Sequence, residues 1–297
     1  MQIADTHTHL YFTSFDRDRN EVIKRNKKSG IDLEVQIGVD EITSIAALDL
    51  AKKHDHMYCT LGVHPCDTEN CFHPNPQYLP QGFGNYKLQA QNFDELFSLF
   101  EKLTEQNPHK IVGFGETGLD LYHKNTPELF QLQKDIFRRH ISLSRKFEKP
   151  IVIHGRNSQK EMLEFLSREI NPGIKASKIP GLGKVTGVIH CFSEDTEYAN
   201  IMTQKYGFYL GIGGVATYPN ARKVREAIVS TPIEFLVTET DAPFLVPQGH
   251  KEQTKRNESS FLPEVVTLIA ELKKISQEEC AEILFQNARK LFQIPPG

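Results

Sequence analysis

Short apolar runs alternate with longer amphipathic segments along almost the whole chain. The runs predict eight strands: Ile3–Thr6, Leu33–Val39, Tyr58–Val63, Ile111–Gly115, Ile151–His154, Val185–His190, Phe208–Ile212 and Phe235–Thr238. Helix-compatible segments separate them at residues 16–28, 42–54, 93–106, 127–148, 157–169, 195–205 and 220–229, and residues 262–290 supply the last helices. Near-continuous apolar strands separated by helices are typical of a parallel sheet that is buried on both faces.

Eight strand–helix units predict an α/β fold of the (β/α)8 TIM-barrel type. The competing interpretation is a doubly wound open sheet, which uses the same units but usually has a glycine-rich phosphate turn after its first strand. Here the first strand ends in His7-Thr8-His9 instead, which favours the barrel. A length of 297 residues is ordinary for one barrel, so we expect a single domain over residues 1–297. Residues 66–92 have little periodicity and predict a long insertion after the third strand.

Composition and charge narrow the class of protein. The hydrophobic fraction of 39% and the charged fraction of 25% are typical of a globular chain, and the sequence has neither a long apolar run nor a secretory signal. Five cysteines without a framework spacing indicate a reducing compartment, so we expect a cytoplasmic protein that does not enter a membrane. A net charge of −3 gives no general attraction for nucleic acid, so any phosphate binding must be local.

Histidines and carboxylates occur at the ends of the predicted strands. Residues i and i+2 of a strand point to the same face, so the imidazoles of His7 and His9 would lie side by side. Two neutral imidazoles in this arrangement suit a divalent ion such as Zn²⁺, although the spacing alone also arises by chance. Further polar residues end other predicted strands: His64, Glu116, His154, His190 and Asp241.

The carboxyl ends of the strands of a barrel share one face, so these side chains would meet there. Each one alone has a plainer interpretation, as a hydrogen-bonded histidine or a helix-capping carboxylate. Buried together, however, four imidazoles and two carboxylates would be costly unless positive charge compensated them, and a pair of divalent cations does so. The six candidate ligands are His7, His9, Glu116, His154, His190 and Asp241.

The other histidines and the paired cysteines carry weaker signals. His54, His56, His109 and His140 lie in or beside predicted helices, and we expect them at the surface or the edge of the core, away from the strand ends. The interpretation of His123 stays open. Cys66 and Cys71 match no common zinc-finger spacing, and no second pair follows them.

Several motifs together carry a resemblance to a known family. They are His7-Thr8-His9-Leu10, Gly62-Val63-His64-Pro65, Gly115-Glu116-Thr117-Gly118-Leu119-Asp120, Ile153-His154, His190-Cys191-Phe192 and Glu239-Thr240-Asp241-Ala242-Pro243. This set, with Gly211–Gly214 and Lys255–Glu258, resembles the TatD-type metal-dependent deoxyribonuclease family of the amidohydrolase superfamily, over residues 3 to 290. The resemblance implies a (β/α)8 barrel, two divalent ions and hydrolysis of DNA phosphodiesters. The chain departs from the family pattern at residues 66–92 and at Leu121-Tyr122-His123.

The resemblance also implies roles for single residues. His7 and His9, with Asp241, would bind the first ion, and His154 with His190 would bind the second. Glu116 would bridge both ions, and His64 would lie beside them and contact the substrate. The ions would be Mg²⁺, Mn²⁺ or Zn²⁺. We expect a hydroxide bridging them to attack the phosphorus while Asp241 accepts its proton.

The expected substrate is DNA, cut from single-stranded or frayed ends without an obligate protein partner. Arg156 and Arg256 are candidates for phosphate contacts. Four aromatic residues would either stack on bases or pack at the rim: Tyr11, Phe12, Phe192 and Tyr218. One alternative is hydrolysis of a small amide, ester or lactone by the same ions. Another is a non-catalytic binding barrel, whose usual signature would be a missing ligand, and none of the six is missing.

Overall fold

The computed structural model describes residues 1–73, 82, 86–123, 126–170 and 185–295. One sheet of eight parallel strands, paired in the order of the sequence, forms the centre of the fold. The strands are β1 (Ile3–Thr8), β2 (Ile31–Ile37), β3 (Met57–Leu61), β4 (Ile111–Asp120), β5 (Ile151–Arg156), β6 (Gly187–Ile189), β7 (Tyr209–Ile212) and β8 (Leu236–Thr238). The predicted (β/α)8 barrel is therefore confirmed.

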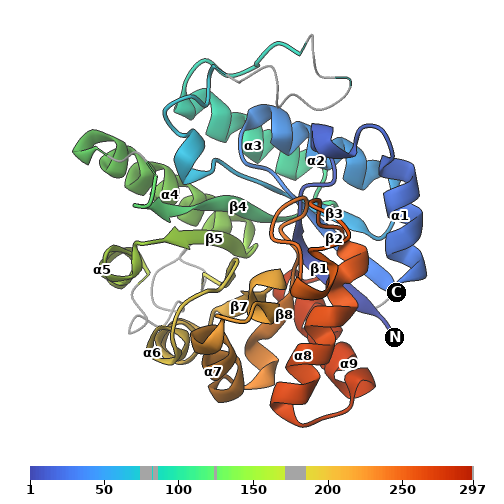
Figure 1. Cartoon of the computed structure of the whole chain (residues 1–297). Helices are drawn as coiled ribbons and strands as arrows, with labels where there is room; N and C mark the ends of the chain where they lie inside the picture. The colour runs from blue at the N-terminus through green and yellow to red at the C-terminus, as the bar shows by residue number, and fades with distance from the viewer. Residues whose placement is uncertain (74–81, 83–85, 124–125, 171–184, 296–297) are drawn as a thin grey trace.

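Helices surround the strands in the order of the sequence (Figure 1). They are α1 (Arg19–Lys28), α2 (Glu41–Lys53), α3 (Phe93–Gln106), α4 (Pro127–Phe147), α5 (Gln159–Glu169), α6 (Thr196–Asn200), α7 (Arg222–Ser230), α8 (Leu262–Lys273) and α9 (Gln277–Leu291). A turn of π-helix, Ile201–Tyr206, continues α6. Local sequence fixes where several of them begin: Asp40 and Thr43 form a capping box at α2, and Thr126 caps α4 in front of a first-turn proline.

Contacts between β1 and β8 close the barrel. The backbone N–H of Asp241 donates to the carbonyl of His7 at 2.8 Å, and that of His9 donates to the carbonyl of Ala242 at 2.9 Å. Further along, the Thr238 hydroxyl donates to the carbonyl of Ala4 at 2.6 Å. These bonds hold the segment after β8 against the end of β1, so the polar residues of the two segments become neighbours.

Strand β4 is longer than the sequence pattern predicts. The predicted strand ends at Gly115, whereas β4 continues through Asp120. Its pairing with β5 is irregular between Phe114 and Thr117, which places Glu116 at a break in the ladder. The residues after Gly115 are mostly polar or glycine, so the apolar pattern did not show that the strand continues. Hydrogen bonds to β5 extend the strand through these residues. The prediction of its end was therefore wrong.

The segment after β3 is described only in part, since residues 74–81 and 83–85 of the predicted insertion lie outside the described residues. A short helical turn at Pro65–Asp67 follows β3. Further on, the Tyr86 hydroxyl and the backbone N–H of Gln89 donate to the Glu41 carboxylate at 2.9 and 2.7 Å. These bonds fasten the end of the segment to the start of α2.

All five cysteines are free thiols. Over the described residues, no helix combines the length and the apolar character that a membrane span requires.

Candidate metal centre

The six predicted ligands meet at the carboxyl ends of the strands. His7 lies in β1, Glu116 in β4 and His154 in β5, while His190 follows β6 directly and Asp241 comes after β8. The side chains are buried, apart from those of His154 and Asp241, which are 16% and 18% exposed. We call these six residues the candidate metal centre.

A first group of ligand atoms gathers around one oxygen of Glu116. The Nε2 atoms of His7 and His9 are 3.3 Å apart, and His7 Nε2 lies 3.3 Å from Glu116 Oε2. Asp241 Oδ1 is 3.6 Å from His7 Nε2 and 3.4 Å from His9 Nε2. Two imidazole nitrogens and two carboxylate oxygens therefore surround one point, as the ligands of a single ion would.

A second group gathers around the other oxygen of the same carboxylate. Glu116 Oε1 lies 2.9 Å from His154 Nδ1 and 3.7 Å from His190 Nε2. Asp241 Oδ1 is 4.0 Å from His190 Nε2, so it stands between the two groups. Oε2 of Glu116 thus faces His7, which lies beside His9, whereas Oε1 faces His154 and His190.

Three of the four imidazoles are oriented by an oxygen behind them. The outward nitrogen of His154 donates to Asp120 Oδ2 at 2.9 Å, and that of His9 donates to the Ile37 carbonyl at 3.0 Å. The outward nitrogen of His190 pairs with Glu239 Oε1 at 2.9 Å. Such partners hold the proton on the outward nitrogen and leave the inward lone pair for a metal.

The charges at the centre are those of a site that needs cations. Burial by itself raises the pKa of Glu116, but the neighbouring imidazoles of His190 and His64 hold it well below its usual range. Burial also lowers the pKa of His190, yet the carboxylates of Glu239 and Glu116 raise it to about 10. A positive charge between these groups is therefore stabilised. Without a metal ion, a proton on an imidazole provides that charge. The donor set of imidazoles and carboxylates fits divalent ions such as Zn²⁺ or Mn²⁺.

His64 faces the centre in a different tautomer. Its Nδ1 accepts the backbone N–H of Cys66 at 3.1 Å, so the neutral ring carries its proton on Nε2. That atom lies 3.4 Å from Glu116 Oε1 and 3.3 Å from His154 Nδ1. His64 is therefore arranged as a hydrogen-bond donor beside the centre, rather than as one of its ligands.

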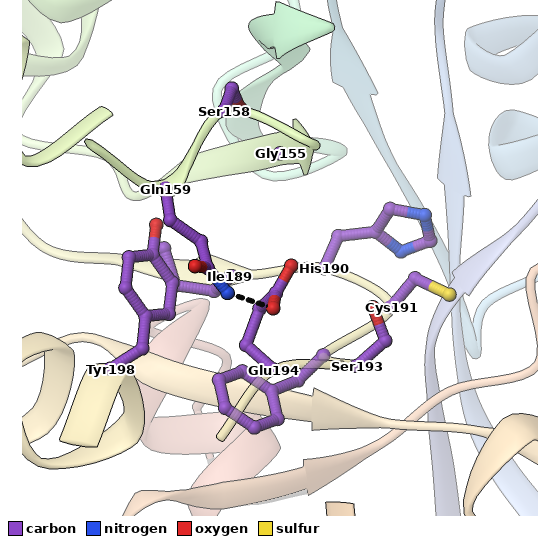
Figure 2. Close-up of a pocket in the computed structure, with 10 residues that line it drawn as sticks. Gly155, Ser158, Gln159, Ile189, His190, Cys191, Ser193, Glu194 and Tyr198 are labelled. Atoms are coloured by element: carbon purple, nitrogen blue, oxygen red, sulfur yellow. Dashed lines mark hydrogen bonds between the residues drawn. The ribbon is translucent and has the colours of Figure 1, made fainter. Parts of the chain in front are cut away.

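A hollow opens next to His190, between the ends of β5 and β6. Figure 2 shows Gln159 and Glu194 joined by a hydrogen bond across it, with Tyr198 on one side and Cys191 beside His190 on the other. Gly155 and Ser158 form the wall that comes from the β5 end. The centre thus borders a surface depression with polar groups.

The family model described as TatD related DNase matches residues 4–293 of the chain. The chain belongs to this family. The metal-dependent hydrolase YabD of Bacillus subtilis (strain 168), called uncharacterized, is 33% identical over 292 residues, which cover 98% of this chain and 99% of YabD. The similarly named YcfH of Escherichia coli (strain K12) is 28% identical over 297 residues, covering 99% and 97%.

Solved structures agree with this assignment to the TatD family. The crystal structure of YjjV, a TatD homologue from Escherichia coli K12, superposes with a TM-score of 0.80 at 26% identity, covering 99% of this chain and 98% of that one. The TatD family hydrolase from Entamoeba histolytica has a TM-score of 0.77 at 20% identity, with 99% of each chain covered, and supports the fold alone. The chain is therefore a member of a family of metal-dependent hydrolases with a TIM-barrel fold.

Two carboxylates of this TatD-family site were not given a role from the sequence. Asp120 and Glu239 stand within the quoted motifs, and both hold outward nitrogens of candidate ligands. The available signal was a carboxylate at a strand end, close in sequence to a ligand. What the sequence does not reveal is the partner of each, because His154 and His190 approach from other strands.

The two predicted arginine contacts differ in their surroundings. The Arg156 guanidinium lies 3.8 Å from the centre of the Tyr122 ring, which is 57% exposed, at the end of β5. Arg256 instead forms two bonds of 2.7 Å with the Asp18 carboxylate and one of 3.0 Å with Glu258. Arg256 would have to leave these ion pairs to bind a phosphate, so Arg156 is the better candidate.

Aromatic side chains line the rim near His9. Phe12 stacks on the His9 ring at 4.8 Å, and Phe244, which is 52% exposed, lies edge-on to Phe12 at 6.2 Å. The sequence suggested Phe12 but not Phe244, which follows Asp241 by three residues. Tyr11 and Phe192 are buried within apolar clusters, and Phe192 also lines the hollow beside His190.

His140 and His123 lie near the candidate metal centre without being among its six ligands. His140 in α4 is fully buried, and its Nε2 accepts the backbone N–H of Val63 at 3.2 Å, so its predicted place at the edge of the core was wrong. The helix places it on the face that packs against the end of β3. His123, left open by the sequence, lies 3.1 Å from the Asp120 carboxylate.

Proposed function

We propose that this TatD-family protein is a divalent-metal-dependent deoxyribonuclease that removes nucleotides from single-stranded or frayed DNA ends. The observation that carries the proposal is the placement of Glu116, whose Oε2 lies 3.3 Å from His7 Nε2 while its Oε1 lies 2.9 Å from His154 Nδ1 and 3.7 Å from His190 Nε2. A carboxylate shared in this way is a usual feature of two-metal phosphoesterase sites. The description of the matching family as a DNase adds support.

The residues divide into two ligand sets. His7, His9 and Asp241 would hold one ion, and His154 with His190 would hold the other. Glu116 would bridge them. When bound, such a pair of ions lowers the pKa of a water molecule and neutralises charge on phosphate oxygens.

Asp241 is suited to accept the proton of the attacking water. Burial raises its pKa, but a hydrogen bond from His9 and the charge of His190 lower it below the usual value, so the carboxylate stays ionised. Its position between the two ligand groups would let it take a proton from a water molecule held there. His64, with its proton on Nε2, would donate to an oxygen of the phosphate.

The rim favours a nucleic-acid strand over a small neutral ester. The guanidinium of Arg156 would meet phosphate oxygens, and the exposed rings of Phe244 and Tyr122 would stack on unpaired bases. Because the chain has a net charge of −3, this binding would rely on local contacts. The proposal needs no membrane and no obligate protein partner, and it fits a cytoplasmic protein.

The test is an assay of purified protein with Mg²⁺ or Mn²⁺ on labelled single-stranded DNA. We expect a ladder of shortened products from linear DNA and none from a covalently closed circle. Glu116→Ala and Asp241→Asn should abolish the ladder, whereas Glu226→Gln, which removes an exposed carboxylate paired only with Arg222 among the described residues, should not. Inert DNA together with turnover of lactones or amides would overturn the proposal in favour of the small-substrate alternative.

A further inference from the structure

A second cluster of metal-binding side chains lies beside the candidate metal centre. Cys66 comes from the turn after β3, Asp120 is the last residue of β4, and His123 follows it. His123 Nδ1 lies 3.3 Å from Cys66 Sγ and 3.1 Å from Asp120 Oδ2. The Cys66 thiol is also hydrogen-bonded to the Asp120 carboxylate. One thiol, one imidazole and one carboxylate therefore meet pairwise.

The spacing of these atoms is that of ligands on one small ion. Around a tetrahedral zinc ion with ordinary bond lengths, neighbouring S, N and O ligands are roughly 3.3–3.6 Å apart. The contacts of 3.1 and 3.3 Å need only small side-chain shifts to reach these values. Three protein ligands leave a fourth position for water.

The chemistry of the cluster differs from that of the candidate metal centre. The centre offers nitrogen and oxygen, whereas Cys66 adds sulfur, which favours thiophilic cations such as Zn²⁺, Co²⁺ or Cd²⁺ over Mg²⁺ and Mn²⁺. The His123 side chain is 53% exposed, so an ion can enter from solvent, while Asp120 is buried. Burial and the nearby Asp120 charge raise the pKa of the Cys66 thiol to about 12, so an ion must displace its proton.

We propose that Cys66, Asp120 and His123 form a separate binding site for one thiophilic divalent cation of the zinc class. The site is connected to the candidate metal centre through Asp120, whose Oδ2 also accepts the His154 Nε2–H at 2.9 Å. An ion at this site would therefore hold the residue that orients His154. The site does not depend on which substrate the protein hydrolyses.

Titration of the metal-free full-length protein with Co²⁺ tests the proposal, because only a thiolate ligand produces a near-ultraviolet sulfur-to-cobalt charge-transfer band. We expect a band whose intensity stops rising once one Co²⁺ per chain occupies the cluster. The band should be lost in Cys66→Ser. The matched control is Cys191→Ser, because Cys191 is the thiol grouped with His190 and Glu239, and this variant should keep the band.

A second variant makes the test independent of how Cys66→Ser folds. His123→Ala alters a largely exposed side chain, and it should weaken the Co²⁺ affinity measured at the band by more than about tenfold, since losing even an outer partner commonly costs that much. No band in the wild-type protein, a band that survives in Cys66→Ser, or a band lost only in Cys191→Ser would each show the proposal to be wrong. Unchanged affinity in His123→Ala would do the same.

Discussion

Glu239 and Asp120 determine how two of the candidate ligands present their nitrogens. Each carboxylate lies 2.9 Å from the outward nitrogen of one imidazole, His190 for Glu239 and His154 for Asp120. A carboxylate in this position fixes the tautomer and raises the basicity of the inward nitrogen. At the scale of single residues, metal affinity should therefore depend on groups that touch no metal.

Glu239→Gln tests this dependence. The amide keeps the shape of the side chain but removes the negative charge behind His190, so metal affinity should fall by about 10–100-fold. Isothermal titration of the metal-free protein with Mn²⁺ measures the change. Glu226→Gln, on the exposed face of α7, is the control and should bind as the wild type does. Equal affinities for Glu239→Gln and wild type would contradict the account.

The sequence predicted the candidate ligands better than the residues that orient them. His7, His9 and Glu116 stand in short motifs whose residue types and order point to a metal site. The roles of Asp120 and Glu239 depend on contacts between different strands, which no local pattern records. The pairing of Arg256 with Asp18 could not be predicted for the same reason, because the two residues are 238 positions apart.

At the scale of elements, strand β4 and helix α4 position residues of the site. Strand β4 continues past Gly115, where the sequence pattern placed its end, so Glu116 lies inside the strand. The pairing with β5 is irregular at this position. Helix α4 reaches across to the end of β3, where His140 accepts the backbone N–H of Val63. Helical periodicity alone could not assign His140 to the core, because histidine is as common at the edge as inside.

His140→Leu tests the support that α4 gives to the site. Leucine fills a similar volume but leaves the buried N–H of Val63 without its acceptor, which should lower the free energy of unfolding by about 1–3 kcal/mol. Activity should fall as well, because His64 follows Val63 directly. Urea denaturation measures the first effect. Ser142→Ala, on an exposed position of the same helix, should change neither quantity, and a fully stable His140→Leu would refute the assignment.

At the scale of the whole molecule, the alternation of apolar strands and helices predicted a parallel α/β fold, because every unit of the fold repeats it, and the His7-Thr8-His9 end of the first strand favoured the barrel over an open sheet. The closure of the sheet between β8 and β1 could not be predicted from that pattern. It depends on bonds between segments more than 230 residues apart, such as the one from Asp241 to His7. Those bonds bring the last ligand to the first two, so the closed barrel and the candidate centre form together.

The stability of the barrel should depend on the protonation of Glu34 in β2. Burial, with the charge of Asp5, raises the pKa of Glu34 from 4.5 to about 8. The folded state therefore keeps a proton that the unfolded chain releases, so this contribution to stability is full below pH 4.5 and is lost as the pH rises through 8.

Glu34→Gln should remove that pH dependence. Asn26 still has an amide oxygen to donate to, so the variant should keep the fold and become more stable than wild type as the pH approaches 8. Denaturant unfolding at several pH values compares the two proteins. The exposed Glu252→Gln should keep the wild-type slope. Parallel curves for wild type and Glu34→Gln would show that Glu34 does not titrate as proposed.

Anomalous diffraction from crystals loaded with Mn²⁺ would show whether Glu116 joins two metal ions. Manganese is suitable because it does not favour the thiolate of Cys66. We expect two anomalous peaks about 3.5–4 Å apart. One should lie against His7 and His9, the other against His154 and His190, with the Glu116 carboxylate between them. A single peak in a fully loaded crystal, or peaks that Glu116 does not contact, would contradict the bridging role of Glu116.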